Sequence, residues 1–234
     1  MDFKIIHIDE TDSTNKWLKA FGRGKMVVVA EYQTAGKGCG SNSWESEREM
    51  NLTFSILIHP ETVLARDQFR ITEWVSVALC STLQHYIYNK VEIKWPNDIY
   101  VDDRKICGIL IENRLQGTVI KDSIIGIGLN VNQTKFTSDA PNPVSLKQLT
   151  GKDVEREVLL DDFLQAFNKI MVSETVAQEY RNRLYRRVGT YEFEDGNGRF
   201  KAEMVRVETD GRLVLADKTG HERTYTFKEV KFII

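Results

Sequence analysis

The chain has 234 residues, 41% of them hydrophobic, which is enough to build one medium-sized domain and a small second one without cross-links. Its 32 basic residues against 34 acidic ones give a net charge of -2, which excludes the overall positive field of a protein that binds duplex DNA or an anionic membrane. Three cysteines without Cys-x-x-Cys spacing argue against a disulfide framework or a zinc site. Since the sequence also lacks a signal-peptide core and an apolar run of about 20 residues, we expect a cytoplasmic protein.

Short apolar runs bounded by turn residues predict strands. The runs cover residues 5–8, 27–32, 52–58, 91–94, 106–112 and 124–131. Helical spacing of apolar residues predicts helices at 14–21 and 66–88, and a longer stretch at 157–187 that is interrupted near Ser173. Residues 99–101 and the run from Lys105 are expected to form a hairpin. Strands and helices that interleave in this way predict an α/β (α+β) domain.

The sequence pattern changes from Gly189 onward, where glycine and aspartate separate short β-forming runs. These runs cover residues 191–193, 201–208, 212–216, 223–227 and 232–234. They predict a small all-β module that packs on the larger domain. We therefore expect two domains, residues 1–187 and residues 188–234.

A glycine-rich loop follows the second predicted strand and runs from Gln33 to Trp44. Its glycines around Lys37 let backbone N–H groups approach an anion, which favours a phosphate or carboxylate cradle. The loop is neither a P-loop, because Gly38 follows Lys37, nor a good dinucleotide fingerprint, because Ser41 stands where the third glycine belongs. The alternative is a flexible surface loop.

Lys94-Trp95-Pro96-Asn97-Asp98 ends a predicted strand, and Pro96 stops regular pairing there, so that polar groups can turn toward a ligand. Lys105 stands just beyond the next turn, as part of a site or as a solvated charge at a sheet edge. Gly108 interrupts an apolar run, which leaves room for a ligand.

Gly126 and Gly128 alternate within a strongly β-forming run and lie on the same face, with Asn130 at its end. Either a flat ligand or a closely packed helix accounts for this bare face. Ser13-Thr14-Asn15 precedes the first helix, where its hydroxyls serve either as helix caps or as ligands for a neutral polar group.

Taken together and in this order, these segments resemble the biotin protein ligase family, also called biotin-[acetyl-CoA-carboxylase] ligases. The resemblance covers most of the chain, and its specificity lies in the ordered set. The segments that carry it are Ser13-Thr14-Asn15, the run from Glu31 through Gly38 to Trp44, Lys94-Trp95-Pro96-Asn97-Asp98, Lys105 with Gly108-Ile109-Leu110-Ile111-Glu112, and Gly126-Ile127-Gly128-Leu129-Asn130. The family fold is a catalytic domain like that of class II aminoacyl-tRNA synthetases, followed by a small SH3-like β-barrel.

The resemblance implies an enzyme that forms biotinyl-5'-AMP from biotin and ATP and transfers biotin to a lysine of a biotin carboxyl carrier protein or domain. It assigns catalysis to Lys105, Lys37 and Asp98. The implied biotin-binding residues are Ser13, Thr14, Asn15, Gln33, Gly36, Lys37, Gly38, Cys39, Lys105, Gly108, Gly126 and Gly128. The implied nucleotide-binding residues are Lys37, Trp44, Asn97, Asp98 and Asn130. ATP is expected as its Mg²⁺ complex, with no metal held by the protein alone.

The sequence departs from the family pattern in its loop. The family usually has a second basic residue where Cys39 stands, and a glycine near Ser41, whereas the neighbouring glycine here is Gly40. A thiol lacks the permanent charge of a guanidinium, which predicts weaker retention of the adenylate. The first predicted strand begins near Phe3, so we expect no helix-turn-helix domain and no repressor role. A homodimer is compatible with the resemblance.

Two alternatives stay open. A lipoate ligase or octanoyltransferase shares the broad fold and also acylates a lysine, so fold alone does not separate the two activities. A noncatalytic nucleotide-sensing module with a β-barrel interaction domain belongs to a different class.

Overall fold

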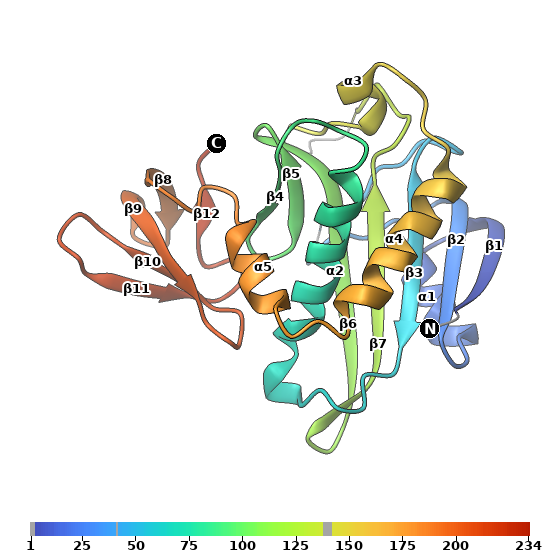
Figure 1. Ribbon diagram of the computed structural model, residues 1–234, viewed down its shortest axis with the longest axis horizontal. Coiled ribbons are helices and arrows are strands. Elements are labelled where there is room, and N and C mark those ends of the chain that lie inside the picture. Colours follow the sequence, from blue (N-terminus) through green and yellow to red (C-terminus); the bar gives the residue numbers. More distant parts are fainter. Residues whose placement is uncertain (1–2, 41, 138–141) are drawn as a thin grey trace.

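A seven-stranded mixed sheet forms the larger part of the molecule, with strand order β1-β2-β3-β7-β6-β5-β4 (Figure 1). The computed structural model describes residues 3–40, 42–137 and 142–234. Strands β1 and β2 are parallel, and the other neighbours are antiparallel. The strands are β1 (Lys4–Thr11), β2 (Met26–Gln33), β3 (Leu52–Ile58), β4 (Val91–Lys94), β5 (Asp98–Val101), β6 (Arg104–Gln116) and β7 (Val119–Leu129).

Helices cover both faces of this sheet. Helices α2 (Phe69–Leu83) and α4 (Arg156–Ile170) lie on one face with α5 (Val176–Asn182) beside α2, and α1 (Thr14–Phe21) lies on the other face (Figure 1). Strand β2 is accordingly buried on both sides, since Met26 and Val28 pack with Leu18 of α1 while Val27 and Val29 belong to the larger core. Within the described ranges, no helix is both long and apolar enough to cross a bilayer.

The predicted strands are all present, and several run further than predicted, β6 and β7 most of all. Strands β6 and β7 continue to pair with each other beyond their apolar runs, through a long hairpin that reaches Gln116 and Val119. The helix predicted at 66–88 is confined to α2, after a short 3-10 turn at Ala65–Asp67. The predicted interruption near Ser173 is confirmed, because it falls between α4 and α5. Helix α3 (Leu146–Thr150) is too short to give a periodic signal and begins with a capping box at Ser145.

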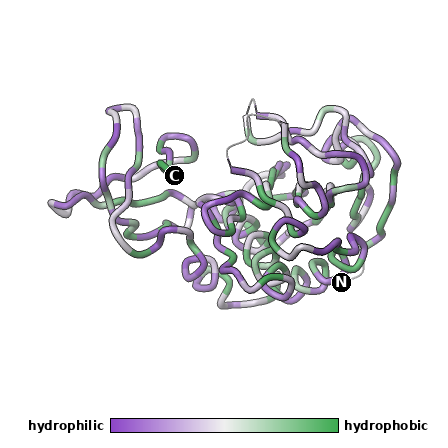
Figure 2. Tube along the Cα trace, turned by 90° about the horizontal axis from the view of Figure 1, so that it is seen from above, coloured by the Kyte–Doolittle hydropathy of each residue, from purple (hydrophilic) through white to green (hydrophobic). Residues whose placement is uncertain are grey.

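The C-terminal strands form a second, fully antiparallel sheet with order β11-β10-β9-β8-β12. Its strands are β8 (Thr190–Asp195), β9 (Gly198–Val207), β10 (Leu213–Ala216), β11 (Glu222–Tyr225) and β12 (Lys231–Phe232). Seen from above, they form a lobe at one end of the molecule (Figure 2). The α/β class and the all-β C-terminal region are confirmed, while SH3-like closure and the domain boundary at residues 187/188 stay predictions.

The β9–β10 turn joins this lobe to the large domain. The indole N–H of the buried Trp95 donates a hydrogen bond of 2.9 Å to the carbonyl oxygen of Gly211. Gly211 has a φ of +91°, and an ideal Cβ there would lie 2.3 Å from a ring carbon of Phe69. Both the conformation and the space therefore require glycine, which lets the turn approach α2 closely.

A single hydroxyl in α5 offers a test of packing around the end of β4. Tyr180 is buried, and its hydroxyl donates a hydrogen bond of 2.6 Å to the carbonyl oxygen of Pro96. We expect Tyr180→Phe to lower the free energy of unfolding by about 1–3 kcal/mol, because a partly buried carbonyl oxygen loses its donor. Urea unfolding measures the change.

Tyr191→Phe is the matched control, since Tyr191 donates to the carbonyl oxygen of Val188 at an exposed position. We expect a change of less than about 0.5 kcal/mol there. An equal loss of stability in the two variants would contradict the role assigned to the bond made by Tyr180.

Candidate functional site

Three segments that are distant in sequence meet on the α1 face of the large sheet: the beginning of α1, the glycine-rich loop, and the paired strands β6 and β7. An ideal Cβ at Gly126 would lie 2.4 Å from Oδ1 of Asn15, and one at Gly128 would lie 2.3 Å from Cε2 of Trp44. These two glycines therefore allow side chains from the other segments to lie directly on the backbone of β7.

The beginning of α1 contributes a polar network. Ser13 is the N-cap residue of α1, yet its hydroxyl makes no capping bond to any described residue, so helix capping does not account for it. The hydroxyl and the backbone N–H of Thr14 donate to Oε1 of Gln33, at 3.0 and 2.8 Å. Ser13, Thr14, Asn15 and Gln33, which were predicted to act together, are thus brought together, and the first three are buried.

Ser55 of β3 joins this network and leaves it with a spare acceptor. Its Oγ lies 2.6 Å from Oγ1 of Thr14 and 2.6 Å from Oδ1 of Asn15. A serine hydroxyl has one hydrogen, and the hydroxyl hydrogen of Thr14 is directed to Gln33, so Ser55 can donate to only one of the two oxygens. The other oxygen keeps a lone pair that suits an N–H group of a ligand.

Glu112 of β6 anchors the other side of Asn15. Nδ2 of Asn15 donates to Oε2 of Glu112 at 2.8 Å, and Nζ of Lys19 donates to Oε1 at 2.6 Å. Burial acts to raise the pKa of Glu112, but the hydrogen bonds from Lys19 and Asn15 outweigh it and hold that pKa below its ordinary value. The carboxylate is therefore ionised at neutral pH and is an acceptor only.

The indole of Trp44 covers the glycines of β6 and β7. An ideal Cβ at Gly108 would lie 2.9 Å from Cζ3 of Trp44, and the indole N–H is buried without a hydrogen-bond partner in the described part of the chain. The resemblance assigned Trp44 to the nucleotide, and Gly108 and Gly128 to biotin. An aromatic ring packs well on bare backbone, and here the indole occupies this surface. A flat ligand that packs on the same glycines therefore requires the indole to move.

Lys105 and Asp98 form an ion pair beside this indole. Their Nζ and Oδ1 atoms are 2.7 Å apart, and the side chains are only 26% and 28% exposed. Nζ of Lys105 lies 5.9 Å from the ring centroid of Trp44. Lys105 is therefore not a solvated edge charge. Burial lowers the pKa of the neighbouring Lys94, although the Asp98 carboxylate acts in the opposite direction.

The glycine-rich loop folds back on itself as a small hairpin. The backbone N–H of Gly38 donates to the carbonyl oxygen of Asn42, and that of Trp44 donates to Gly36. Lys37 is exposed on this hairpin, and its charge is among those that lower the pKa of Glu112. Ser41 lies outside the described residues.

Two of the predicted site residues line a cavity that lies away from this network. Cys39 and Asn97 line a space of about 320 Å³ between the two sheets, together with Phe227 of the C-terminal lobe. Nζ of Lys228 lies 3.4 Å from the carbonyl oxygen of Cys39. Lys105 and Asp98 do not line this space, so the structure divides the predicted residues between two places.

Asn130 follows β7 and is buried. Its Nδ2 donates to the carbonyl oxygen of Val144 at 3.1 Å, whereas its Oδ1 has no partner among the residues that the structure describes. A buried amide oxygen without a donor suits a ligand N–H group.

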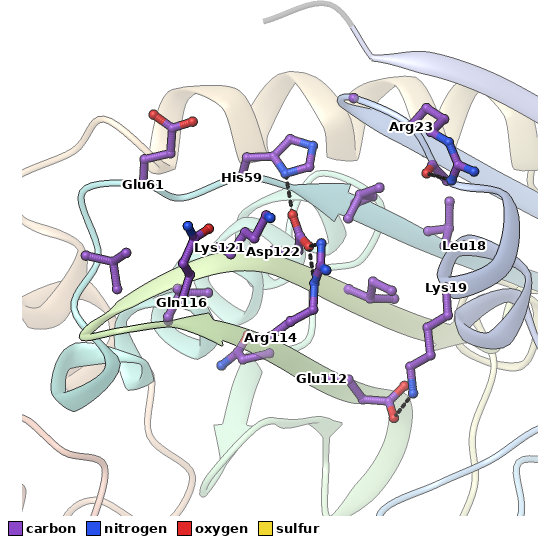
Figure 3. Close-up of a pocket in the computed structure, with 17 residues that line it drawn as sticks. Leu18, Lys19, Arg23, His59, Glu61, Glu112, Arg114, Gln116, Lys121 and Asp122 are labelled. Carbon is purple, nitrogen blue, oxygen red and sulfur yellow. Dashed lines mark hydrogen bonds and ion pairs between the residues drawn. The ribbon is translucent and has the colours of Figure 1, made fainter.

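A larger cavity of about 1030 Å³ adjoins the polar network and extends to the turn end of the β6–β7 hairpin (Figure 3). Asp122 links two of its lining side chains: Oδ1 of Asp122 lies 2.7 Å from Nδ1 of His59, and Oδ2 lies 2.5 Å from Nε of Arg114. Glu112 lines this cavity while holding Asn15 on the other side. The sequence analysis did not anticipate this space.

All three cysteines are free, and burial raises the pKa of Cys80 to about 12. Over residues 3–40, 42–137 and 142–234, no three His, Cys, Asp or Glu side chains gather closely enough to hold a metal ion.

Sequence reasoning assigned neither Ser55 nor Glu112 a role in the site, although Glu112 ends one of the segments that carry the resemblance. Ser55 is a polar residue in β3, a strand whose every residue is buried, and a buried hydroxyl needs a partner. Glu112 closes the apolar run of β6. Both signals are present in the sequence, but neither identifies Asn15 as the partner.

The site thus joins the glycine backbone of β6 and β7, the polar network at the beginning of α1, and the ion pair of Lys105 and Asp98. Residues 5–130 match the family model described as the biotin/lipoate A/B protein ligase family. The chain belongs to this family.

Among its relatives, the bifunctional ligase/repressor BirA of Bacillus subtilis is 30% identical over 174 residues, which cover 70% of this chain and 53% of BirA. The biotin–[acetyl-CoA-carboxylase] ligase of Paracoccus denitrificans is 28% identical, with 67% of this chain and 68% of the relative covered. The chain spans about half the length of the Bacillus relatives that it matches. The biotin protein ligase of Aquifex aeolicus, solved in complex with biotin and ATP, superposes with a TM-score of 0.82 at 23% identity, over 98% of this chain and 99% of that one.

Proposed function

We propose that this chain is an ATP-dependent biotin protein ligase, which forms biotinyl-5'-AMP and then transfers biotin to a lysine of a biotin carboxyl carrier domain. The observation that carries the proposal is the network of Thr14, Asn15 and Gln33 at one end of the face bared by Gly126 and Gly128. Family membership and the fold shared with the Aquifex ligase support it. A cytoplasmic location, where ATP is available, is part of the proposal.

The polar network suits a cyclic urea. A cyclic urea is uncharged and has two N–H donors and one carbonyl acceptor. The spare oxygen of Thr14 or Asn15 is an acceptor for one N–H group. Nε2 of Gln33 is directed to the glycine loop, where it lies 3.1 Å from an ideal Cβ at Gly36, and is a donor for the carbonyl. Ser13, Gly38 and Cys39 complete the biotin-binding set that we infer from the resemblance.

In the first step, a carboxylate oxygen of biotin attacks the α-phosphorus of ATP, and the bond to the pyrophosphate oxygen breaks. Both reactants are anions, so we assign Lys37, Lys105 and the backbone N–H groups of the loop to hold them together. Mg²⁺ enters with the ATP phosphates, since it keeps several waters and seldom uses a cage made only of protein groups. The nucleotide side is assigned to Trp44, Asn97, Asp98 and Asn130.

In the second step, the neutral amine of the acceptor lysine attacks the acyl carbon of the mixed anhydride, and AMP leaves. Asp98 is the candidate that receives the amine proton. Because Asp98 is paired with Lys105, the ion pair must open or shift toward AMP before this carboxylate acts as a base. The loop that carries Trp44 is expected to exclude water from the adenylate.

Incubation with biotin, MgATP and a biotin carboxyl carrier domain tests the function, with intact-protein mass spectrometry of the acceptor. We expect one biotinyl group on a single lysine. Labelling with lipoate in place of biotin would instead support a lipoate ligase. A chain that binds nucleotide but catalyses no biotin-dependent exchange of pyrophosphate into ATP would support the noncatalytic sensor.

The loop residue Cys39 gives a prediction about leakage of the adenylate. We expect Cys39→Arg to label fewer nonspecific lysines on bystander proteins than the wild type, because a guanidinium near the loop adds a permanent cation that retains an anionic intermediate. Cys39→Ser, which changes the side chain without adding charge, is expected to label like the wild type. Equal bystander labelling by Cys39→Arg and the wild type would refute the prediction.

A further inference from the structure

Glu112 separates the polar network from the larger cavity. Its Oε2 accepts from Asn15 on the network side, and its Oε1 accepts from Lys19, with which it lines the cavity (Figure 3). It thus holds a buried amide from a partly exposed position, since its side chain is 36% exposed and Asn15 as a whole is 4% exposed.

The orientation of the Asn15 amide depends on this carboxylate. An asparagine amide can turn over and exchange its oxygen and nitrogen, and the partner groups decide which orientation is stable. An ionised carboxylate only accepts, so Glu112 requires Nδ2 on its side. Oδ1 then faces Ser55 and is the amide atom closest to an ideal Cβ at Gly126.

Ser55 alone does not fix this orientation. A hydroxyl both donates and accepts, so it can pair with either end of the amide. Leu110 accepts from Nδ2 only at 3.4 Å, which is a long hydrogen bond. Without Glu112 the amide can therefore turn its N–H group toward the bare face of β7, where it would oppose a ligand N–H group.

We propose that Glu112 is a positioning residue for biotin recognition, which keeps the Asn15 oxygen directed at a ureido N–H group. This inference rests on the proposed function and deepens it, because it identifies the group that selects a hydrogen-bond donor at this point of the ligand. Glu112 acts through Asn15 and does not take part in the chemistry of either reaction step.

Isothermal titration of biotin, without ATP, tests the inference on the full chain. For Glu112→Ala we expect the Kd to rise about tenfold, which corresponds to one lost hydrogen bond of about 1.4 kcal/mol. For Glu112→Gln we expect about a threefold rise, because its amide oxygen still accepts but its orientation is no longer unique. At saturating biotin, kcat should stay within about twofold of the wild type, so that the loss appears in KM.

Two cavity variants are matched controls. Glu61→Ala removes an exposed carboxylate that lines the same cavity and is expected to keep the wild-type Kd. Lys19→Ala removes the ion pair but leaves the Asn15–Glu112 bond, so its Kd should stay within about twofold. If Lys19→Ala raises the Kd for biotin as much as Glu112→Ala does, then the ion pair rather than the amide orientation controls biotin binding, and the inference is wrong.

Ligand analogues give a second measurement, the ratio of the Kd of an analogue to the Kd of biotin, which a general loss of structure would not change. In each of the two cyclic carbamate analogues of biotin, one ureido N–H is replaced by oxygen. For one analogue we expect the wild type to bind about tenfold more weakly than it binds biotin. In Glu112→Ala the two Kd values should lie within about twofold of each other, because Asn15 no longer selects a hydrogen-bond donor. An unchanged ratio would overturn the inference, as would wild-type affinity for biotin in Glu112→Ala. A wild type that binds no biotin would remove the proposed function itself.

Discussion

Replacing Lys105 by alanine is expected to lower the rate of adenylate formation by about 100- to 1000-fold, the range seen when one group that stabilises developing charge is removed. The ammonium of Lys105 lies 2.7 Å from Asp98, in a position mostly shielded from water. With the lysine gone, two anionic reactants would meet beside an unpaired carboxylate. Biotin-dependent pyrophosphate release measures the rate.

Folding should be much less affected than the reaction. Asp98 retains some exposure, 28% of its side chain, so water can solvate it when its partner is removed. Lys121→Ala is the control, because Lys121 is an exposed lysine that lines the cavity at the β6–β7 hairpin, outside the proposed site. Thermal unfolding confirms that the variants are folded at the assay temperature. Pyrophosphate release by Lys105→Ala at the wild-type rate would remove Lys105 from the mechanism.

Much of the fold follows from local patterns in the sequence. The first four residues of the run 27–32 are all apolar, and this part of β2 is in fact buried by α1 on one side and by the larger core on the other. The sequence did not predict how far β6 and β7 extend, because pairing between the two strands stabilises residues that are not themselves apolar. Helix α3 was missed because its start depends on a capping bond rather than on a repeat.

The site was predictable to the extent that each residue signals its chemistry locally. Gly126 and Gly128 in a β-forming run indicated a bare sheet face, and the structure has side chains lying on both. The contact of Asn15 with Glu112 spans 97 residues of sequence, so no spacing indicates it. The position of the Trp44 indole depends likewise on how the loop folds over the sheet, which a single sequence does not encode as a pattern.

Gly128→Ala is expected to raise the Kd for biotin by between about 10- and 100-fold, in line with the 1–3 kcal/mol that an added methyl group costs in a tightly packed place. An ideal Cβ there would lie 2.3 Å from Cε2 and 2.4 Å from Nε1 of Trp44, so the ring cannot stay on the strand. The same methyl group would also project from β7 toward a flat ligand packed on that strand. Gly196→Ala is the control, because its Cβ would meet nothing within 4 Å.

The two effects of this methyl group can be separated in a Trp44→Ala background. There the clash with the indole is gone, and only contact between the methyl group and the ligand remains. If Gly128→Ala still weakens biotin binding by the same factor, the bicyclic ring lies on β7 where the indole lies in this structure, and the indole must leave before biotin enters. If the effect disappears, the methyl group acts by displacing Trp44, and biotin does not touch Gly128.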